Sequence, residues 1–154
     1  MRYYTHLLFG LFLGILFLGY FDNSLLFLSV VIVSSLLPDI DTLHSFVGKR
    51  LPPLSFVIYL LFGHRRFFHS LICLGVVAFL ISFFHSTLAL GFLIGYSSHL
   101  FLDALTPEGI WPLFPFHFKI KGFIRTGSFF EHIFFVFLVF LVLFTLITGH
   151  RFFI

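Results

Sequence analysis

The stretch 129–148, FFEHIFFVFLVFLVLFTLIT, decides what kind of protein this chain forms. After Glu131 and His132 its only polar side chains are two threonines. A helix needs roughly 20 consecutive apolar residues to cross the hydrocarbon core of a bilayer, and this stretch has that length. It therefore predicts a membrane-spanning helix that ends before Gly149.

The rest of the chain has the same apolar character. Of its 154 residues, 60% are hydrophobic and only 10% are charged, which is typical of integral membrane proteins. Four further apolar runs lie at 3–21, 25–37, 67–84 and 88–105. We expect residues 1–154 to form a single integral membrane domain of the all-α class, a polytopic helical bundle with about five membrane-embedded helices. Only the run 25–37 is shorter than a span needs, so we expect it to borrow flanking residues or to tilt little in locally thinned lipid.

Two polar segments, 38–66 and 106–128, connect these runs. The first contains an apolar stretch at 54–62 that is too short to span, so we expect an interfacial or re-entrant helix there. The second is rich in aromatic residues from Trp111 to Phe118, which is typical of a loop at the membrane interface.

Basic residues predict the orientation. In a five-span topology, eight of the nine lysines and arginines fall on the side of the N-terminus, and only Arg151 falls on the other. By the positive-inside rule the N-terminus and both polar segments are cytoplasmic and the C-terminus is outside. We therefore expect a multi-pass protein of the cell (inner) membrane. We expect no cleavable signal, because the first run lacks a small-residue cleavage site.

Each apolar run brings at least one ionisable side chain to this predicted cytoplasmic face. Such residues are costly near lipid and by default mark a functional site. They are His6, Asp39, Asp41, His64, His69, His99, Asp103 and Glu131. His99 and Asp103 are four residues apart and hence lie on one helical face.

Imidazoles and carboxylates gathered at one depth predict a site for a divalent metal. The expected ligands are His6, Asp39, His64, His69, His99, Asp103 and Glu131. Zinc is favoured, with manganese or iron as alternatives, and the number of ligands allows one or two ions. The single cysteine, Cys73, excludes a cysteine-based zinc site.

Three side chains are expected to act on a substrate. Asp41 or Glu131 would serve as general base if it is not a ligand, and Arg65 would bind an anionic group. Taken singly, every candidate also has a structural interpretation. The two aspartates after Pro38 fit a turn, Arg65 fits an interfacial anchor, and Glu131 fits a favourable charge at a helix N-terminus.

Three motifs carry a resemblance to a known family. They are Leu37–Asp41 (LPDID), His64–Ser70 (HRRFFHS) and Gly95–Asp103 (GYSSHLFLD). Together they resemble the YdjM family, inner-membrane proteins described as metal-dependent hydrolases. That family is in turn distantly similar to zinc-dependent phospholipases C, which are helical enzymes with His, Asp and Glu ligands. The resemblance implies a metal-dependent hydrolase but does not name a substrate.

We therefore expect a membrane-bound metal-dependent hydrolase at the inner lipid interface. Its partners would be membrane lipid and a small amphiphilic substrate, such as a phosphorylated lipid or a similar ester. The alternative is a non-catalytic, metal-stabilised scaffold or partner subunit. A metal or proton transporter is less well supported, because the middles of the spans lack an ionisable relay. Nucleic-acid binding is not expected, since the basic residues are few and interfacial.

Overall fold

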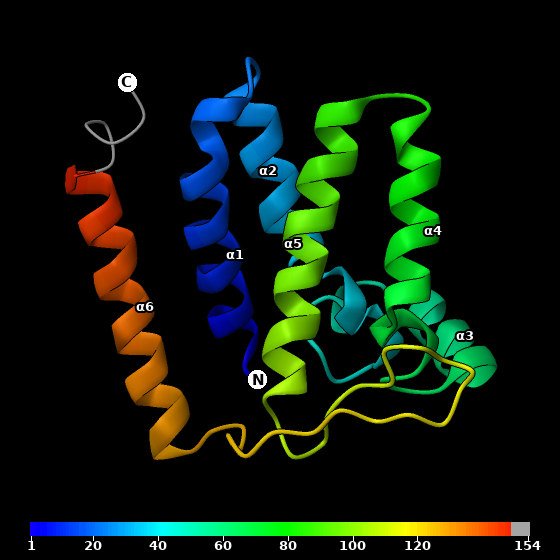
Figure 1. Ribbon diagram of the computed structural model, residues 1–154. Helices are drawn as coiled ribbons and strands as arrows, with labels where there is room; N and C mark the ends of the chain where they lie inside the picture. The colour runs from blue at the N-terminus through cyan, green and yellow to red at the C-terminus, as the bar shows by residue number, and fades with distance from the viewer. Residues whose placement is uncertain (149–154) are drawn as a thin grey trace.

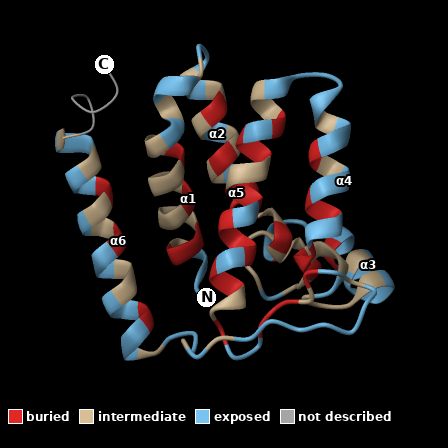
Figure 2. Ribbon diagram, viewed as in Figure 1, coloured by how far each residue is buried: buried red, intermediate tan, exposed pale blue. Residues whose placement is uncertain are grey.

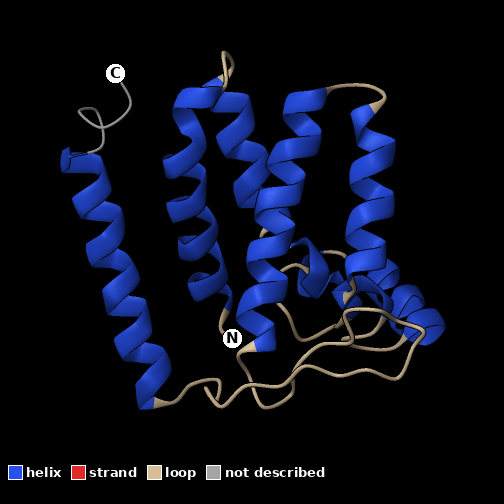
Figure 3. Ribbon diagram, viewed as in Figure 1, coloured by secondary structure: helices blue, strands red, loops and turns tan. Residues whose placement is uncertain are grey.

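The apolar runs form helices that stand side by side in the computed structural model, which describes residues 1–148 (Figure 1). The upright helices are α1 (Tyr3–Phe17), α2 (Ser24–Ser34), α4 (Leu71–Ser82), α5 (Ser86–Ala104) and α6 (Phe129–Thr148). Short 3₁₀ turns are η1 (Leu18–Tyr20), η2 (Leu37–Asp41), η3 (Gly48–Arg50) and η4 (Phe67–His69). The predicted all-α class is confirmed, because residues 1–148 contain no strand (Figure 3).

Four helical stretches are long and apolar enough to cross a membrane: 3–20, 24–41, 86–104 and 129–148. The run 25–37 reaches spanning length because flanking residues in η2 prolong it, as expected. The span expected at 67–84 was wrong. The run 67–84 yields a helix of only 12 residues, since Ser70 caps α4 by accepting a hydrogen bond from the Cys73 N–H. The count of five spans stays a prediction, and Gly149, His150 and Arg151 lie outside the described residues.

Helix α5 is the centre of the bundle and packs against α1, α2 and α4. Its close approach to α2 depends on Gly95, where an added Cβ would collide with the Val31 carbonyl. Phe92, Tyr96 and Leu100 line the buried core on the α4 side. Helix α6 packs against α1 and leaves most of its phenylalanines exposed, as expected of a surface facing lipid.

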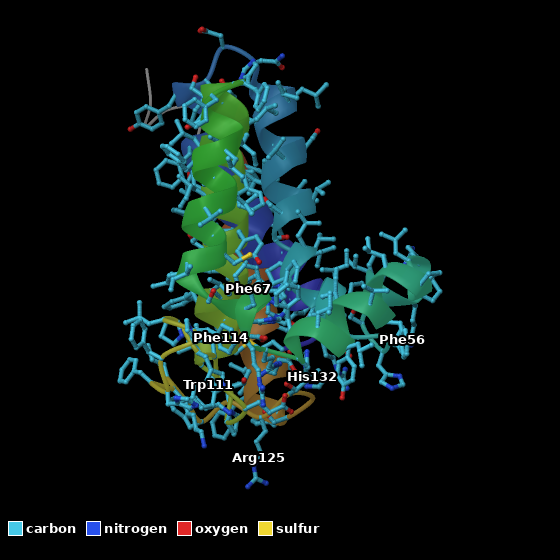
Figure 4. The ribbon with its side chains drawn as sticks, turned by 90° about the vertical axis from the view of Figure 1, so that its right-hand side faces the viewer. Phe56, Phe67, Trp111, Phe114, Arg125 and His132 are labelled. Carbon is cyan, nitrogen blue, oxygen red and sulfur yellow. The ribbon has the colours of Figure 1, made fainter. Side chains whose placement is uncertain are left out.

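One end of the bundle, which we call the foot, collects the connecting segments. It comprises the segment 35–70 apart from α3, the loop 105–128 that crosses beneath the bundle, and the adjoining ends of α1, α5 and α6 (Figure 1). Helix α3 (Pro52–Phe62) projects sideways from the foot and carries Phe56 away from the bundle (Figure 4). Only Ser55 of α3 is buried, which agrees with the expected short apolar helix outside the bundle.

Most of the buried polar side chains also lie at the foot. They include Thr5, His6, Asp41, His69, His99, Asp103, Thr106 and Glu131. Buried positions are visible along the lower ends of α1 and α5 and in the turns beside them (Figure 2). Buried polar groups require partners, and the foot is therefore where the contacts of these side chains must be traced.

Candidate metal centre

Four of the predicted ligands meet at the foot. Asp39 comes from η2, His69 from η4, and His99 and Asp103 from α5. Each offers one ligand atom, and these atoms all lie within 4.8 Å of one another. Three of the residues are fully buried, whereas the Asp39 side chain is 17% exposed and gives the cluster its one open edge.

The spacing of the ligand atoms fits a single divalent ion. His69 Nε2 lies 3.4 Å from Asp103 Oδ2, and His99 Nε2 lies 3.7 Å from both Asp103 Oδ2 and Asp39 Oδ1. Tetrahedral zinc, with bonds of about 2.0–2.1 Å, needs ligand atoms about 3.3 Å apart. Both Nε2 atoms are buried without a hydrogen-bond partner among the described residues, and an ion would satisfy both. Asp103 Oδ2 makes no hydrogen bond either, but it has an ion-pair contact with Arg65.

The opposite nitrogens of the two imidazoles are held by hydrogen bonds. His69 Nδ1 lies 3.0 Å from Asp41 Oδ2, and His99 Nδ1 lies 2.8 Å from the Ser35 carbonyl oxygen. A carboxylate and a carbonyl accept protons and do not donate them, so each Nδ1 carries the proton. In the neutral imidazole each Nε2 then offers its lone pair to a metal, which is the usual arrangement of metal-binding histidines.

Asp41 is a hub of contacts next to the cluster. Its Oδ1 lies 2.7 Å from His64 Nδ1, and its Oδ2 accepts from the Arg65 backbone N–H at 2.8 Å as well as from His69. Both oxygens are therefore engaged in positioning neighbours. His64, whose side chain is 33% exposed, contacts the cluster through Asp41. The predicted roles of Asp41 as general base and of His64 as ligand stay predictions.

The neighbouring carboxylates change the proton affinity of His69. Burial alone would lower its pKa, but the contacts with Asp103 and Asp41 outweigh this and raise the pKa to about 9. A metal needs the deprotonated nitrogen and must displace this proton. Metal affinity is therefore expected to increase as the pH rises towards that value.

His6 lies against the cluster from α1. Its ring stacks on that of His99 with centroids 3.9 Å apart, and its Nε2 lies 3.3 Å from Asp103 Oδ1. The amino group of Met1 is 2.7 Å from the same oxygen. Asp103 thus faces the four-residue cluster with Oδ2 and His6 with Oδ1, so His6 is placed beside the four and not among them.

Arg65 connects the cluster to the surface of the foot. It has a positive φ of 57°, unusual for a residue with a side chain, in a conformation that the Asp41 contact holds. One guanidinium nitrogen, Nη2, lies 3.1 Å from Asp103 Oδ2. The other, Nη1, lies 3.0 Å from Thr106 Oγ1 and 3.3 Å from the exposed Glu108 carboxylate.

An open pocket of about 280 Å³ adjoins these outward contacts. Thr106, Pro107, Glu108, Arg125 and Thr126 line it. Two of these residues, Thr106 and Glu108, are the outward partners of Arg65. Arg65 itself is not among the lining residues, so the pocket is connected to the arginine through these two side chains.

Glu131 is the predicted site residue that the structure places apart from the four. It accepts hydrogen bonds from the Arg2 N–H at 2.6 Å, the Thr5 hydroxyl at 3.2 Å and the Gly127 N–H at 2.5 Å. It thereby ties the start of α1 and the end of the long loop to the first turn of α6. Its predicted roles as ligand and general base stay predictions.

Two participants were not identified from the sequence. The Ser35 carbonyl is a backbone group, and no side-chain pattern points to it. Glu108 lies five residues after Asp103, past the end of α5. It comes near Arg65 because the chain turns back at Thr106. The sequence did offer one signal for Glu108, because it is an acidic residue that closely follows the predicted ligand Asp103.

These features define a class: an all-helical membrane protein with a buried His/Asp cluster at one end of its bundle. Within that class, the family model "YdjM inner membrane protein" matches residues 1–153, and the chain belongs to that family. The family resemblance expected from the three motifs is therefore confirmed.

Curated relatives support the assignment. The uncharacterized protein YvsG of Bacillus subtilis (strain 168) is 39% identical over 105 residues, covering 66% of each chain. The inner membrane protein YdjM of Escherichia coli (strain K12) is 39% identical over 99 residues, covering 58% of this chain and 50% of that protein; YdjM of Shigella flexneri matches equally. The matched part thus spans about half to two thirds of these relatives. No solved structure matches the chain significantly.

Replacing His99 by alanine should reduce the bound metal. The variant removes one ligand atom and leaves Asp103 and His69 with an incomplete shell. Elemental analysis of purified protein should show at least one ion per chain in the wild type and a clear loss in His99→Ala. His44→Ala is the matched control, because His44 is an exposed histidine outside the cluster. Unchanged stoichiometry in His99→Ala would remove His99 from the ligand set.

Replacing Asp41 by asparagine should weaken metal binding without abolishing it. The variant keeps the shape of the side chain but loses the negative charge that orients His69, and such changes cost about 10- to 100-fold in affinity. Competition with a chromophoric chelator measures the affinity. Wild-type affinity in Asp41→Asn would mean that Asp41 does not position the ligand.

Proposed function

We propose that this protein is a membrane-bound, metal-dependent hydrolase. It acts at the inner lipid interface on a phosphorylated lipid or a similar amphiphilic ester. The observation that carries the proposal is the largely buried Asp39/His69/His99/Asp103 cluster, whose ligand atoms converge beside Arg65, and Arg65 in turn contacts two residues that line an open pocket.

These four residues would hold the divalent ion, with zinc favoured by the mixed nitrogen and oxygen ligands and manganese or iron as alternatives. When bound, such an ion supplies Lewis-acid chemistry, activating water and polarising an ester group. Asp41 and the Ser35 carbonyl hold the imidazoles in the required orientation. In this proposal Asp41 is a positioning residue.

Arg65 recognises the substrate's anionic group. A planar guanidinium binds a phosphate through two parallel hydrogen bonds, which an ammonium cannot reproduce. Its contact with the 69%-exposed Glu108 is the one that an anionic substrate would replace, whereas the contact with Asp103 keeps it next to the cluster. The substrate's phosphate is thereby aligned between the pocket and the proposed metal ligands.

An amphiphilic substrate fits the surroundings of the foot. Helix α3 exposes Leu54, Phe56, Val57 and Leu60, and the loop 105–128 exposes Phe116 and Phe118. Exposed apolar surfaces of this extent mark contact with a membrane or a partner. The proposed orientation places the foot, with eight of the nine basic residues, on the cytoplasmic side.

A structural metal centre is the second candidate. Four protein ligands suffice to fill a tetrahedral shell, and filled shells are characteristic of structural zinc sites. In that case the ion would stabilise the foot as a scaffold or as part of a partner subunit.

Single-cysteine labelling tests the orientation. Lys49→Cys at the foot and Ser86→Cys at the opposite end of the bundle are introduced into a Cys73→Ala background. An impermeant maleimide added to intact cells should label residue 86, and residue 49 only after the membrane is opened. Labelling of both positions in intact cells would contradict the proposed topology.

Lipid hydrolysis is tested with purified, reconstituted protein. It is loaded with zinc, manganese or iron and incubated with mixed membrane lipids that include phosphatidic acid, and the products are followed by mass spectrometry. We expect the wild type to release product and the Asp39→Ala/His99→Ala double variant to be inactive. Arg65→Lys should lower the rate on the order of a hundredfold, because a bidentate contact is lost.

Arg50→Lys is the matched control for that experiment, because Arg50 is exposed and lies over the Phe46 ring, outside the cluster and the pocket. It should retain the wild-type rate. If the wild type and the double variant give identical products with every metal, the hydrolase proposal fails. A loss of thermal stability on metal removal would then support the structural centre.

A further inference from the structure

A second pocket, of about 90 Å³, lies at the foot beneath α4. Arg66, Trp111, Phe114, Pro115 and His117 line it. The Leu71 N–H donates to the Pro112 carbonyl at 2.8 Å, which fixes the aromatic loop against the start of α4. Trp111 and Phe114 are visible below the lower end of α4 in Figure 4.

This pocket is separate from the candidate metal centre although the two are adjacent in sequence. Arg65, with its positive φ, directs its guanidinium to Asp103, whereas the next residue, Arg66, lines the second pocket. None of the lining residues of this pocket belongs to the four-residue cluster. The two consecutive arginines therefore contact two different sites, Arg65 the candidate metal centre and Arg66 the second pocket.

The charge of the pocket favours an anion. Arg66 is exposed and has no ion-pair partner within 4.0 Å among residues 1–148, and no acidic side chain lines the pocket. Lys119 adds a second cation, with Nζ 5.5 Å from the centre of the Trp111 ring. Two cations without a neighbouring acid attract a negatively charged group.

The loop that supplies most of the lining residues also exposes apolar side chains, which favours an amphiphilic ligand. Leu113, Phe116 and Phe118, chain neighbours of the lining residues, are 46–68% exposed. Tryptophan beside basic residues is characteristic of the headgroup level of a membrane. We infer that this pocket binds the phosphate headgroup of an intact anionic phospholipid, whose acyl chains lie along the exposed apolar side chains. The inference does not depend on hydrolysis at the metal centre.

Trp111 provides a direct test, because it is the only tryptophan of the chain. The protein is reconstituted into phosphatidylcholine vesicles in which a fraction of the lipid carries brominated acyl chains, which quench tryptophan fluorescence on contact. At equal mole fraction, brominated phosphatidylglycerol should quench Trp111 more than brominated phosphatidylcholine. The apparent preference should be about fivefold for each basic contact.

Arg66→Gln should remove most of this preference, and Lys119→Gln should reduce it. Arg50→Gln is the matched control: Arg50 is exposed, lies over the Phe46 ring and lines neither pocket, so the preference should persist. Glycerol phosphate and inorganic phosphate at millimolar concentration should not relieve the quenching by the brominated anionic lipid.

Three results would overturn the inference. Equal quenching by the two brominated lipids in the wild type would show that the pocket does not select anionic lipid, and this holds whether or not any variant folds. An equal loss in Arg50→Gln and Arg66→Gln would indicate diffuse attraction to the whole surface. Relief of quenching by the soluble phosphates would identify a free anion as the ligand.

Discussion

The constraint on which the foot depends is a carboxylate buried in an apolar bundle. Asp103 has no exposed surface, and a charge in such surroundings is stable only with compensating partners. Those partners come from separate elements: His6 from α1, His69 from η4 and Arg65 from the turn before it. The irregular segments at the foot are therefore held where they are by the need to neutralise one side chain of α5.

Close helix packing makes the rest of the centre possible. Gly95 allows α5 to approach α2, and Gly10 of α1 lies against Ser35 at the end of α2. Small residues permit such approaches in membrane bundles, where dispersion forces and hydrogen bonds, not hydrophobic burial, drive helix association. Because the backbones are close, the Ser35 carbonyl reaches His99 and orients it.

Much of this arrangement was predictable because it depends on local patterns. Apolar runs revealed the helices, and the four-residue spacing of His99 and Asp103 placed both on one face. Contacts that depend on the path of the backbone were not predictable. Ser70 caps the N-terminus of α4, so the helix starts four residues later than the apolar run, and the positive φ of Arg65 separates it from Arg66. The sequence placed Glu131 at the same membrane depth as the other acidic residues. Hydrogen bonds from the Arg2 and Gly127 N–H groups instead hold its carboxylate apart from the four-residue cluster.

The length of α4 has a mechanical consequence for the surrounding bilayer. Twelve residues rise about 18 Å, well short of the roughly 30 Å of a typical hydrocarbon core. A lipid layer next to a helix this short becomes thinner at a modest elastic cost, and its polar surface moves towards the bilayer midplane. Along α4 the membrane surface would therefore form a depression. Headgroups in that depression would reach the level of His69 while their acyl chains stay in the hydrocarbon layer.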